Sequence, residues 1–426
     1  MLMLLVERAQ GLLGVAAMLL IAYLMSYERR RIDWRLVASG LILQAAFGAL
    51  VLKTAPGRWC FEKLGDLANA LLAFSVVGSR FAFGYLVDLA APAGVPSASG
   101  LPAFAFRILP IIIFLSSLTS VLYYLGWMQR VVKAISWVML RTLKTSGAET
   151  LCASGNIFLG QTEAPLLIRP YLEGLTPSEL VAVMTAGFAT MAAGVMTAYA
   201  IMLQPYVPQV AGHLLAACVM NAVASLVVAK MLHPETEVPR TRGTLHIDVP
   251  PEETSIIDAA ARGAATGLRL ALNVLAMLIA FIALVALFNQ VVAAAGALVG
   301  FPDATLQGLL GQLLRPFAWL MGVPWPETAY VGSLIGLKIV LNEFVAYLQF
   351  STDLGAGVAS LAPRSAVIAT YALVGFANVG SIAIQIGGLG ALAPGRQADV
   401  ARFGVRAMIG GNLAAFLSAS LAGMLV

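Results

Sequence analysis

Residues 151–170 read LCASGNIFLGQTEAPLLIRP, and they place a glycine, an amide, a hydroxyl, a carboxylate and a proline almost in a row inside an apolar stretch. Two further interruptions of this kind follow, NEFVAY at 342–347 and GFANVGS at 375–381. A charged side chain at the centre of a membrane costs about 2.5–3.5 kcal/mol on insertion scales, so each interruption needs a physical reason.

The composition is that of a membrane protein. The 426-residue chain is 60% hydrophobic and 11% charged, with mean hydropathy +0.88, whereas a soluble protein needs more charged surface. The net charge of +5 does not indicate nucleic-acid binding, because the basic residues collect between the apolar runs. No HExxH, GxxxxGK[ST] or GxSxG motif occurs, and Cys60, Cys152 and Cys218 are spaced too widely for a metal pair. We expect these cysteines to be small buried residues.

The apolar runs predict the number of membrane spans, because a spanning helix needs about 20 mostly apolar residues. Eight runs qualify: 9–26, 36–53, 108–128, 178–202, 209–231, 267–298, 366–391 and 404–425. Half of the 26 lysines and arginines fall in 27–35, 129–150, 232–266 and 392–403, whereas the predicted outside loop 299–327 contains one, Arg315. The positive-inside rule therefore places both termini outside. Lys53, Arg58 and Lys63 do not fit this topology. Arg58 and Lys63 lie in 54–106, a segment for which we expect interfacial or surface helices, and Lys53 directly precedes it.

The order of the runs predicts an all-α fold with an inverted repeat. The polar linker 233–266 separates a first half, 107–232, from a second half, 267–426, and each half contains a helix, a polar-tipped segment and two more helices. The two halves start on opposite sides of the membrane, as in secondary transporters with inverted repeats. Residues 1–106 would form a scaffold of N-terminal helices. The segments carrying GQTEAP and NEFVAY are predicted to be re-entrant hairpins, because irregular backbone at membrane depth must be buried or line a wet cavity.

The polar clusters favour a carrier of a neutral, hydroxylated, partly aromatic solute. Gln161 and Glu163 supply amide and carboxylate groups that suit a polar ring or a diol, and no cation points to an anionic ligand. Asn378 and Ser381 are three residues apart and share a helix face. A structural role remains open in which Glu163 or Glu343 pairs with Arg169 or Lys338. An intramembrane enzyme would need a close acid–base pair with a nucleophile or metal, and a channel would need rings of repeated polar residues.

Several blocks resemble a known family. GNIFLGQTEAPLLIRPYL, KIVLNEFVAYLQF and GFANVGSIAIQIGGLG are similar to signatures of the concentrative nucleoside transporters, and so are FAFGYLVD, ILPIIIFLSSLTSVLYYLGWMQ and GLRLALNVLAMLIAFIALVAL. The similarity runs from about residue 75 to the C-terminus and suits a bacterial member. It implies eight spanning helices with two hairpins in an inverted repeat, and a homotrimer in the bacterial inner membrane. It also implies transport rather than enzymatic activity.

The resemblance also implies a binding site for a nucleoside and a sodium ion. The nucleobase would contact the tip of the first hairpin, and the ribose would be held by the second hairpin and the seventh helix. The implied nucleoside residues are Gly160, Gln161, Thr162, Glu163 and Val195 for the base, Glu343, Asn378 and Ser381 for the ribose, and Phe376 packing against the nucleoside. The implied sodium ligands are the Asn156 side chain, the Thr190 hydroxyl and the backbone carbonyls of Leu159 and Met191.

The implied activity is sodium-coupled symport of nucleosides such as uridine by alternating access, with no organic cofactor. Hard oxygen ligands suit a hard cation such as sodium. Thr190 stands where the family leads us to expect Ser, and a threonine keeps the hydroxyl. Gly380 stands where many relatives have Ser, so a preference for purines or pyrimidines does not carry over. Proton coupling, with Glu163 as the carrier, is the alternative.

Overall fold

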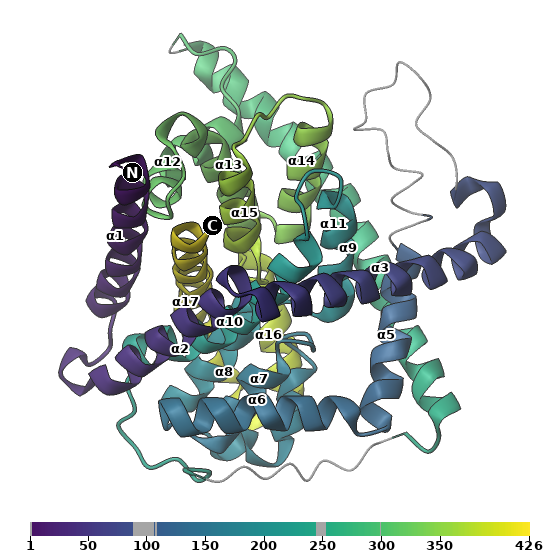
Figure 1. Cartoon of the computed structure of the whole chain (residues 1–426), viewed down its shortest axis with the longest axis vertical. Coiled ribbons are helices and arrows are strands. Elements are labelled where there is room, and N and C mark those ends of the chain that lie inside the picture. The colour runs from purple at the N-terminus through teal and green to yellow at the C-terminus, as the bar shows by residue number, and fades with distance from the viewer. Residues whose placement is uncertain (1, 88–105, 107–108, 244–252, 299) are drawn as a thin grey trace.

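Helices make up most of the described chain in this computed structural model, which describes residues 2–87, 106, 109–243, 253–298 and 300–426 (Figure 1). No β-strand occurs within those ranges. Two N-terminal helices each begin with a residue whose side chain caps the helix. The side chain of Asp33 accepts hydrogen bonds from the first backbone N–H groups of α2 (Trp34–Lys53), and the Thr54 side chain does the same for α3 (Ala55–Phe83). Such caps satisfy donors that a helix start leaves unpaired.

The N-terminal part contains α1 (Leu2–Leu24), α2 and α3. Where surface helices were expected in 54–106, α3 is one continuous helix that extends across the front of the molecule (Figure 1). Its placement in the membrane interface stays a prediction, and 88–105 lie outside the described residues.

The first half of the predicted repeat differs from the expected spans in two places. The predicted span 108–128 ends early, because α5 (Leu109–Tyr124) and α6 (Trp127–Leu143) meet at 77° around Gly126, whose φ is +77°. The predicted span 178–202 is interrupted at 190–192, between two shorter helices. The remaining elements are α7 (Gly147–Gly155), the 3-10 segment η5 (Ala164–Gly174), α8 (Pro177–Ala189), α9 (Ala193–Leu203) and α10 (Val210–Leu232).

The second half repeats this order of elements. Two helices lead to a hairpin of two helical segments, then to a broken helix and a final unbroken helix. The stretch 299–327, predicted to be an outside loop, contains the helix α12. The elements are α11 (Ile256–Leu298), α12 (Leu306–Leu320), α13 (Thr328–Val340), α14 (Glu343–Gly355), α15 (Pro363–Leu373), α16 (Val379–Leu392) and α17 (Gln397–Leu425).

Contacts between elements follow the same correspondence. Helix α6 packs on α7 as α12 packs on α13, and α8 packs on α10 as α15 packs on α17. Across the halves, α8 contacts α17 and α15 contacts α10. In Figure 1, α6, α7 and α8 lie toward the lower end, whereas α12, α13 and α14 lie toward the upper end.

The unbroken helices α10 and α17 lie in the core and support both helix breaks. The Asn221 amide of α10 donates to the Ala189 carbonyl at 2.8 Å, and the Asn412 amide of α17 donates to the Ala377 carbonyl at 2.9 Å. Gly375 has φ +101°, and a Cβ there would come within 2.7 Å of the Ala189 carbonyl carbon. The two breaks therefore touch at a point where only glycine fits.

Five described helical stretches are long and apolar enough to cross a membrane if α8 and α9 count as one stretch, or six if the bent pair α5–α6 also forms one span. Many apolar side chains of α11 are exposed, among them Leu272, Ile279, Leu287 and Phe288. A helix that exposes so much apolar surface faces lipid or a protein partner. The fold is that of a helical, multi-pass membrane protein, and the count of eight spans stays a prediction.

Candidate functional site

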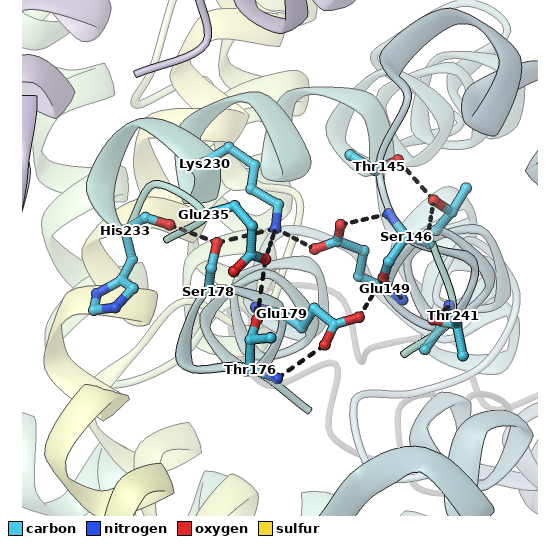
Figure 2. Close-up of polar contacts among 12 residues, drawn as sticks. Thr145, Ser146, Glu149, Thr176, Ser178, Glu179, Lys230, His233, Glu235 and Thr241 are labelled. Atoms are coloured by element: carbon cyan, nitrogen blue, oxygen red, sulfur yellow. Dashed lines mark hydrogen bonds and ion pairs between the residues drawn. The ribbon is translucent and has the colours of Figure 1, made fainter. Parts of the chain in front are cut away.

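A buried polar cluster fixes the base of the first hairpin, formed by α7 and η5 (Figure 2). Near the end of α10, the Lys230 ammonium lies 2.8 Å from a Glu149 oxygen of α7 and 3.1 Å from Glu235. It also donates to the Ser178 hydroxyl of α8 at 2.9 Å. One cation thus holds the starts of α7 and α8 against the end of α10.

The starts of α7 and α8 are also linked directly. Ser146 and Glu149 form a capping box at α7, and Thr176 and Glu179 form one at α8. The Ser146 hydroxyl also donates to a Glu179 oxygen, so the two boxes are joined (Figure 2). Such boxes satisfy orphan N–H groups at helix starts. These hydrogen bonds hold the base of the hairpin in place and so fix where its tip lies.

That tip meets the break between α8 and α9. The Ala193 N–H donates to the Phe158 carbonyl at 3.0 Å, and Ala192 lies against Gly160. The four predicted sodium ligands, Asn156, Leu159, Thr190 and Met191, are all buried at this junction.

The junction has free oxygen ligands for a hard cation. The Asn156 Oδ1 atom is buried and has no hydrogen-bond partner in the structure. The Thr190 hydroxyl donates to the Ala186 carbonyl at 2.8 Å, which leaves its lone pairs available. Because a buried acceptor without a partner is costly, an ion that uses Asn156 Oδ1 would relieve that cost. The residue types present fit sodium.

The second hairpin, α13 and α14, places its carboxylate against a helix break. Glu343 begins α14 and is 4% exposed. One carboxylate oxygen accepts from the Tyr199 hydroxyl of α9 at 2.9 Å, and the other accepts from the Asn378 amide at 3.2 Å. Asn378 is the N-cap of α16, and its own side-chain oxygen accepts from the Ser381 N–H. The structure thus brings together Glu343, Asn378 and Ser381, the three residues that the resemblance implies for the ribose.

Tyr199 was not foreseen from the sequence. It stacks on Tyr347 of α14 with ring centroids 4.2 Å apart and meets Phe344 edge-on at 5.4 Å. An aromatic residue in an apolar helix gives no signal of a polar role, because most such residues only pack. Its hydroxyl fixes the Glu343 carboxylate, which the sequence-based alternative had paired with Lys338. Lys338 instead hydrogen-bonds two backbone carbonyls.

Gln385 is the second residue that the sequence analysis missed. Its amide donates to the Gln161 side-chain oxygen at 3.1 Å and to the Met184 carbonyl at 3.0 Å, which joins the first hairpin to α16 and α8. The spacing of Asn378, Ser381 and Gln385 is three and then four residues, a polar stripe along one helix face. That periodicity could have revealed it.

A cavity of about 400 Å³ opens beside the first hairpin. Its lining includes Glu163 and Leu159 of the hairpin, Tyr123 of α5, Gly194 of α9 and Thr266 of α11. The size suits a small organic ligand. Of the residues predicted to bind nucleoside, Glu163 belongs to this lining, whereas Glu343 and Asn378 lie buried between α9, α14 and α16.

Two of the remaining predicted nucleoside residues lie at the helix breaks, and a third lies against α16. Val195 is buried in the first turn of α9, and Phe376 is partly buried in the break between α15 and α16. Thr162 is exposed, and its methyl group approaches Gly388 of α16.

This geometry can be compared with known proteins. The family model described as "Na+ dependent nucleoside transporter C-terminus" matches residues 213–423, and the corresponding N-terminal model matches 13–86. A third model, described as "Nucleoside recognition", matches 105–206. An uncharacterized transporter of Bacillus subtilis, YutK, is 43% identical over 98% of this chain and 99% of its own length. The chain belongs to the concentrative, Na+-dependent nucleoside transporter family.

Other nucleoside transporters share both sequence and fold with it. Sodium/nucleoside cotransporter 2 of Rattus norvegicus is 39% identical over 98% of this chain and 63% of its own length. The structure of the transporter CNTnw in an inward-facing, substrate-bound state superposes with a TM-score of 0.89 at 42% identity, covering 98% of each chain. The prediction of a membrane transporter rather than an enzyme is confirmed for this nucleoside transporter.

Proposed function

We propose that this nucleoside transporter is a symporter that moves one nucleoside, such as uridine, together with sodium by alternating access. The observation that carries the proposal is the buried Glu343 carboxylate, held by Tyr199 and Asn378 where the second hairpin meets a broken helix. A carboxylate at this depth is costly unless it serves a ligand or a transport step.

The ribose would bind at this carboxylate. Each Glu343 oxygen has lone pairs beyond the one that Tyr199 or Asn378 uses, so the carboxylate can accept further hydrogen bonds from a vicinal diol. Ser381 lies beside Asn378 on α16 and adds a hydroxyl. Phe376 would pack against the bound nucleoside.

The nucleobase would bind at the tip of the first hairpin. Because Gln385 occupies the side-chain oxygen of Gln161, the Gln161 NH₂ group remains for a base carbonyl. Glu163 would accept a ring N–H, and Val195 would supply an apolar wall. Gly160 and Thr162 complete the predicted tip.

Sodium would order the junction between the first hairpin and the α8–α9 break. Asn156 and Thr190 would supply side-chain oxygens, and Leu159 and Met191 would supply carbonyls. The sodium site thus shares a hairpin with the nucleobase site, so binding of the ion and of the base would support each other. One sodium moving inward across 100 mV gains about 2.3 kcal/mol. This sustains roughly a 50-fold solute gradient, since about 1.4 kcal/mol corresponds to a factor of ten.

The architecture that we propose has eight spanning helices and two re-entrant hairpins. Residues 1–106 form the scaffold, 107–232 and 267–426 form an inverted repeat, and 233–266 form a cytoplasmic linker. The matching contacts of α6, α7, α8 and α10 with those of α12, α13, α15 and α17 support the repeat. We further propose a homotrimer in the bacterial inner membrane, with both termini outside.

The cavity beside Glu163 suggests the release path. Polar residues of α5, including Ser116, Thr119 and Ser120, also line this cavity. A nucleoside leaving the site would pass between the first hairpin and the pair α5–α11.

Uptake of radiolabelled uridine into proteoliposomes tests the proposal. The voltage is fixed, no pH gradient is imposed, and the outside contains either sodium or choline. Uptake with sodium alone supports sodium symport, and uptake in choline that requires a proton gradient moves the coupling to protons. No uptake under either gradient by folded protein would overturn the proposal.

A further inference from the structure

Lys338 is a fully buried lysine in the first helix of the second hairpin, and the transport cycle described above does not use it. Its side chain is 0% exposed. The ammonium donates to the Ala372 and Val374 carbonyls, each at 3.0 Å, and lies 6.0 Å from the centre of the Phe416 ring. Within the described part of the chain, no carboxylate forms an ion pair with it.

The two carbonyls belong to the C-terminal end of α15, where the helix breaks. The last carbonyls of a helix have no partner within it, and the helix dipole makes that end negative. At membrane depth such an end needs a cation or strong donors, and half-helix ends in transporters commonly coordinate the coupling ion. At α15 the lysine supplies that positive charge from within the chain.

The first half has a matching helix end without a lysine. Val374 is the C-cap of α15, and Thr190 is the C-cap of α8. The hairpins also correspond, since α13 contacts α15 as α7 contacts α8. Lys338 lies four residues before Asn342 at one hairpin turn, and Cys152 lies four residues before Asn156 at the other.

We propose that the Lys338 ammonium is a tethered cation, which takes in the second half the place that sodium takes in the first. The inference rests on the proposed sodium site and deepens it. Because the second site is permanently filled, the transporter carries one sodium, and one net charge, for each neutral nucleoside.

The tether also makes the two hairpins unequal. Sodium binding orders the α8–α9 break further, whereas the α15–α16 break keeps the same degree of order in every state of the cycle. Sodium therefore gates the nucleobase end of the site, and the ribose end keeps its geometry.

The first measurement is the charge moved per nucleoside by the wild-type protein. Purified transporter in proteoliposomes is set at a series of voltages, and the reversal of net uridine flux gives the charge ratio. One charge per uridine is expected. Two charges would overturn the proposal while leaving sodium symport intact. Sodium-independent flux would instead defeat the proposed coupling.

The second measurement removes the tether. In Lys338→Ala, uridine affinity at a sodium concentration that saturates the wild type should fall at least tenfold. The Hill coefficient for sodium in uridine binding should rise from one toward two as an ion enters the vacated place. Lys338→Arg, which keeps the cation, should retain a coefficient of one. A Lys338→Ala protein with wild-type affinity and a coefficient of one would overturn the proposal.

Hydrogen exchange gives a readout that is independent of transport. In wild type, sodium should slow exchange in peptides covering 156–163 and 190–193 but leave 372–378 unchanged. In Lys338→Ala without sodium, exchange in 372–378 should become several-fold faster. Equal sodium protection of both breaks in the wild type would contradict the tethered cation even if the alanine variant failed to fold.

Discussion

The Asn378 amide donates to the Glu343 carboxylate across 3.2 Å and so joins the start of α16 to the start of α14. The two side chains come from a broken helix and a hairpin, 35 residues apart in the chain. Asn378 is the N-cap of α16, and Glu343 is the first residue of α14. Their contact places a carboxylate and an amide where a diol could bind between two rigid helix starts.

Replacing Glu343 with Gln should weaken uridine binding roughly 10- to 150-fold. Hydrogen bonds to a charged acceptor contribute about 1.5–3 kcal/mol, and the neutral amide loses that charge and one acceptor oxygen. Isothermal titration in detergent measures the affinity. Glu237→Gln, in an exposed loop, is the matched control and should bind as wild type. Retained affinity in Glu343→Gln would remove this residue from the site.

Replacing Gln385 with Ala should lower uridine affinity roughly 3- to 10-fold, because Gln161 loses the partner that orients it. A hydrogen bond between neutral groups contributes about 0.5–1.5 kcal/mol. The affinity of a competing purine nucleoside should change by a different factor, because Gln161 would contact the nucleobase. Gln290→Ala on the exposed side of α11 serves as the control. Unchanged affinity for both nucleosides would show that Gln385 only packs.

Replacing Lys230 with Met should destabilise the protein strongly. The change leaves Glu149, which is 1% exposed, without its cation, and breaking a buried pair costs about 3–5 kcal/mol. Thermal unfolding in detergent measures the loss. Lys63→Met is the matched control, because the Lys63–Asp66 pair is exposed and worth about 0–1 kcal/mol. A similar melting temperature for the two variants would contradict a stabilising role of Lys230 in the buried polar cluster at the base of the first hairpin.

Acid should destabilise the protein through His233, which follows α10. Burial, and then the charge of Arg406, hold the pKa of the His233 imidazole below its usual value of 6.5. The folded state therefore disfavours protonation, so its stability is complete above pH 6.5 and falls as the pH drops below that value.

The His233 ring stacks on Tyr27 with ring centroids 5.0 Å apart and meets Phe403 edge-on at 5.2 Å. The charged side chains that act on it are Arg406, Glu235, Lys230 and Arg402.

The measurement is the melting temperature from pH 8 to pH 5 for wild type and His233→Phe. The phenylalanine keeps the ring contacts but cannot bind a proton. The wild type should lose more stability below pH 6.5 than the variant does. Parallel curves would show that other groups cause the acid sensitivity.

The sequence predicted the all-helical fold and the polar clusters because both depend on local patterns. The cost of a carboxylate in an apolar segment singled out Glu343, and the structure places it beside Asn378. The buried cysteines Cys152 and Cys218 also agree with prediction. These features can be recognised from residue type and spacing alone.

Tertiary contacts explain what the sequence did not reveal. The turn at Gly126 depends on a left-handed backbone conformation that an apolar run does not disclose. The break at Thr190 depends on a neighbouring helix, because Asn221 of α10 takes up the freed Ala189 carbonyl. Tyr199 became a polar partner only when folding brought α9 to α14. Partners that are distant in the chain cannot be found from a local period.

Asn221 and Asn412 shape the two helix breaks from helices that carry none of the predicted nucleoside residues. A survey limited to groups that touch the solute would omit both. A single substitution in α10 or α17 can therefore change the geometry of a helix break without changing any residue that contacts the solute. Natural selection on the range of substrates can act through such substitutions. Divergent members of such a lineage would share the same contact residues and still differ in the solutes that they accept.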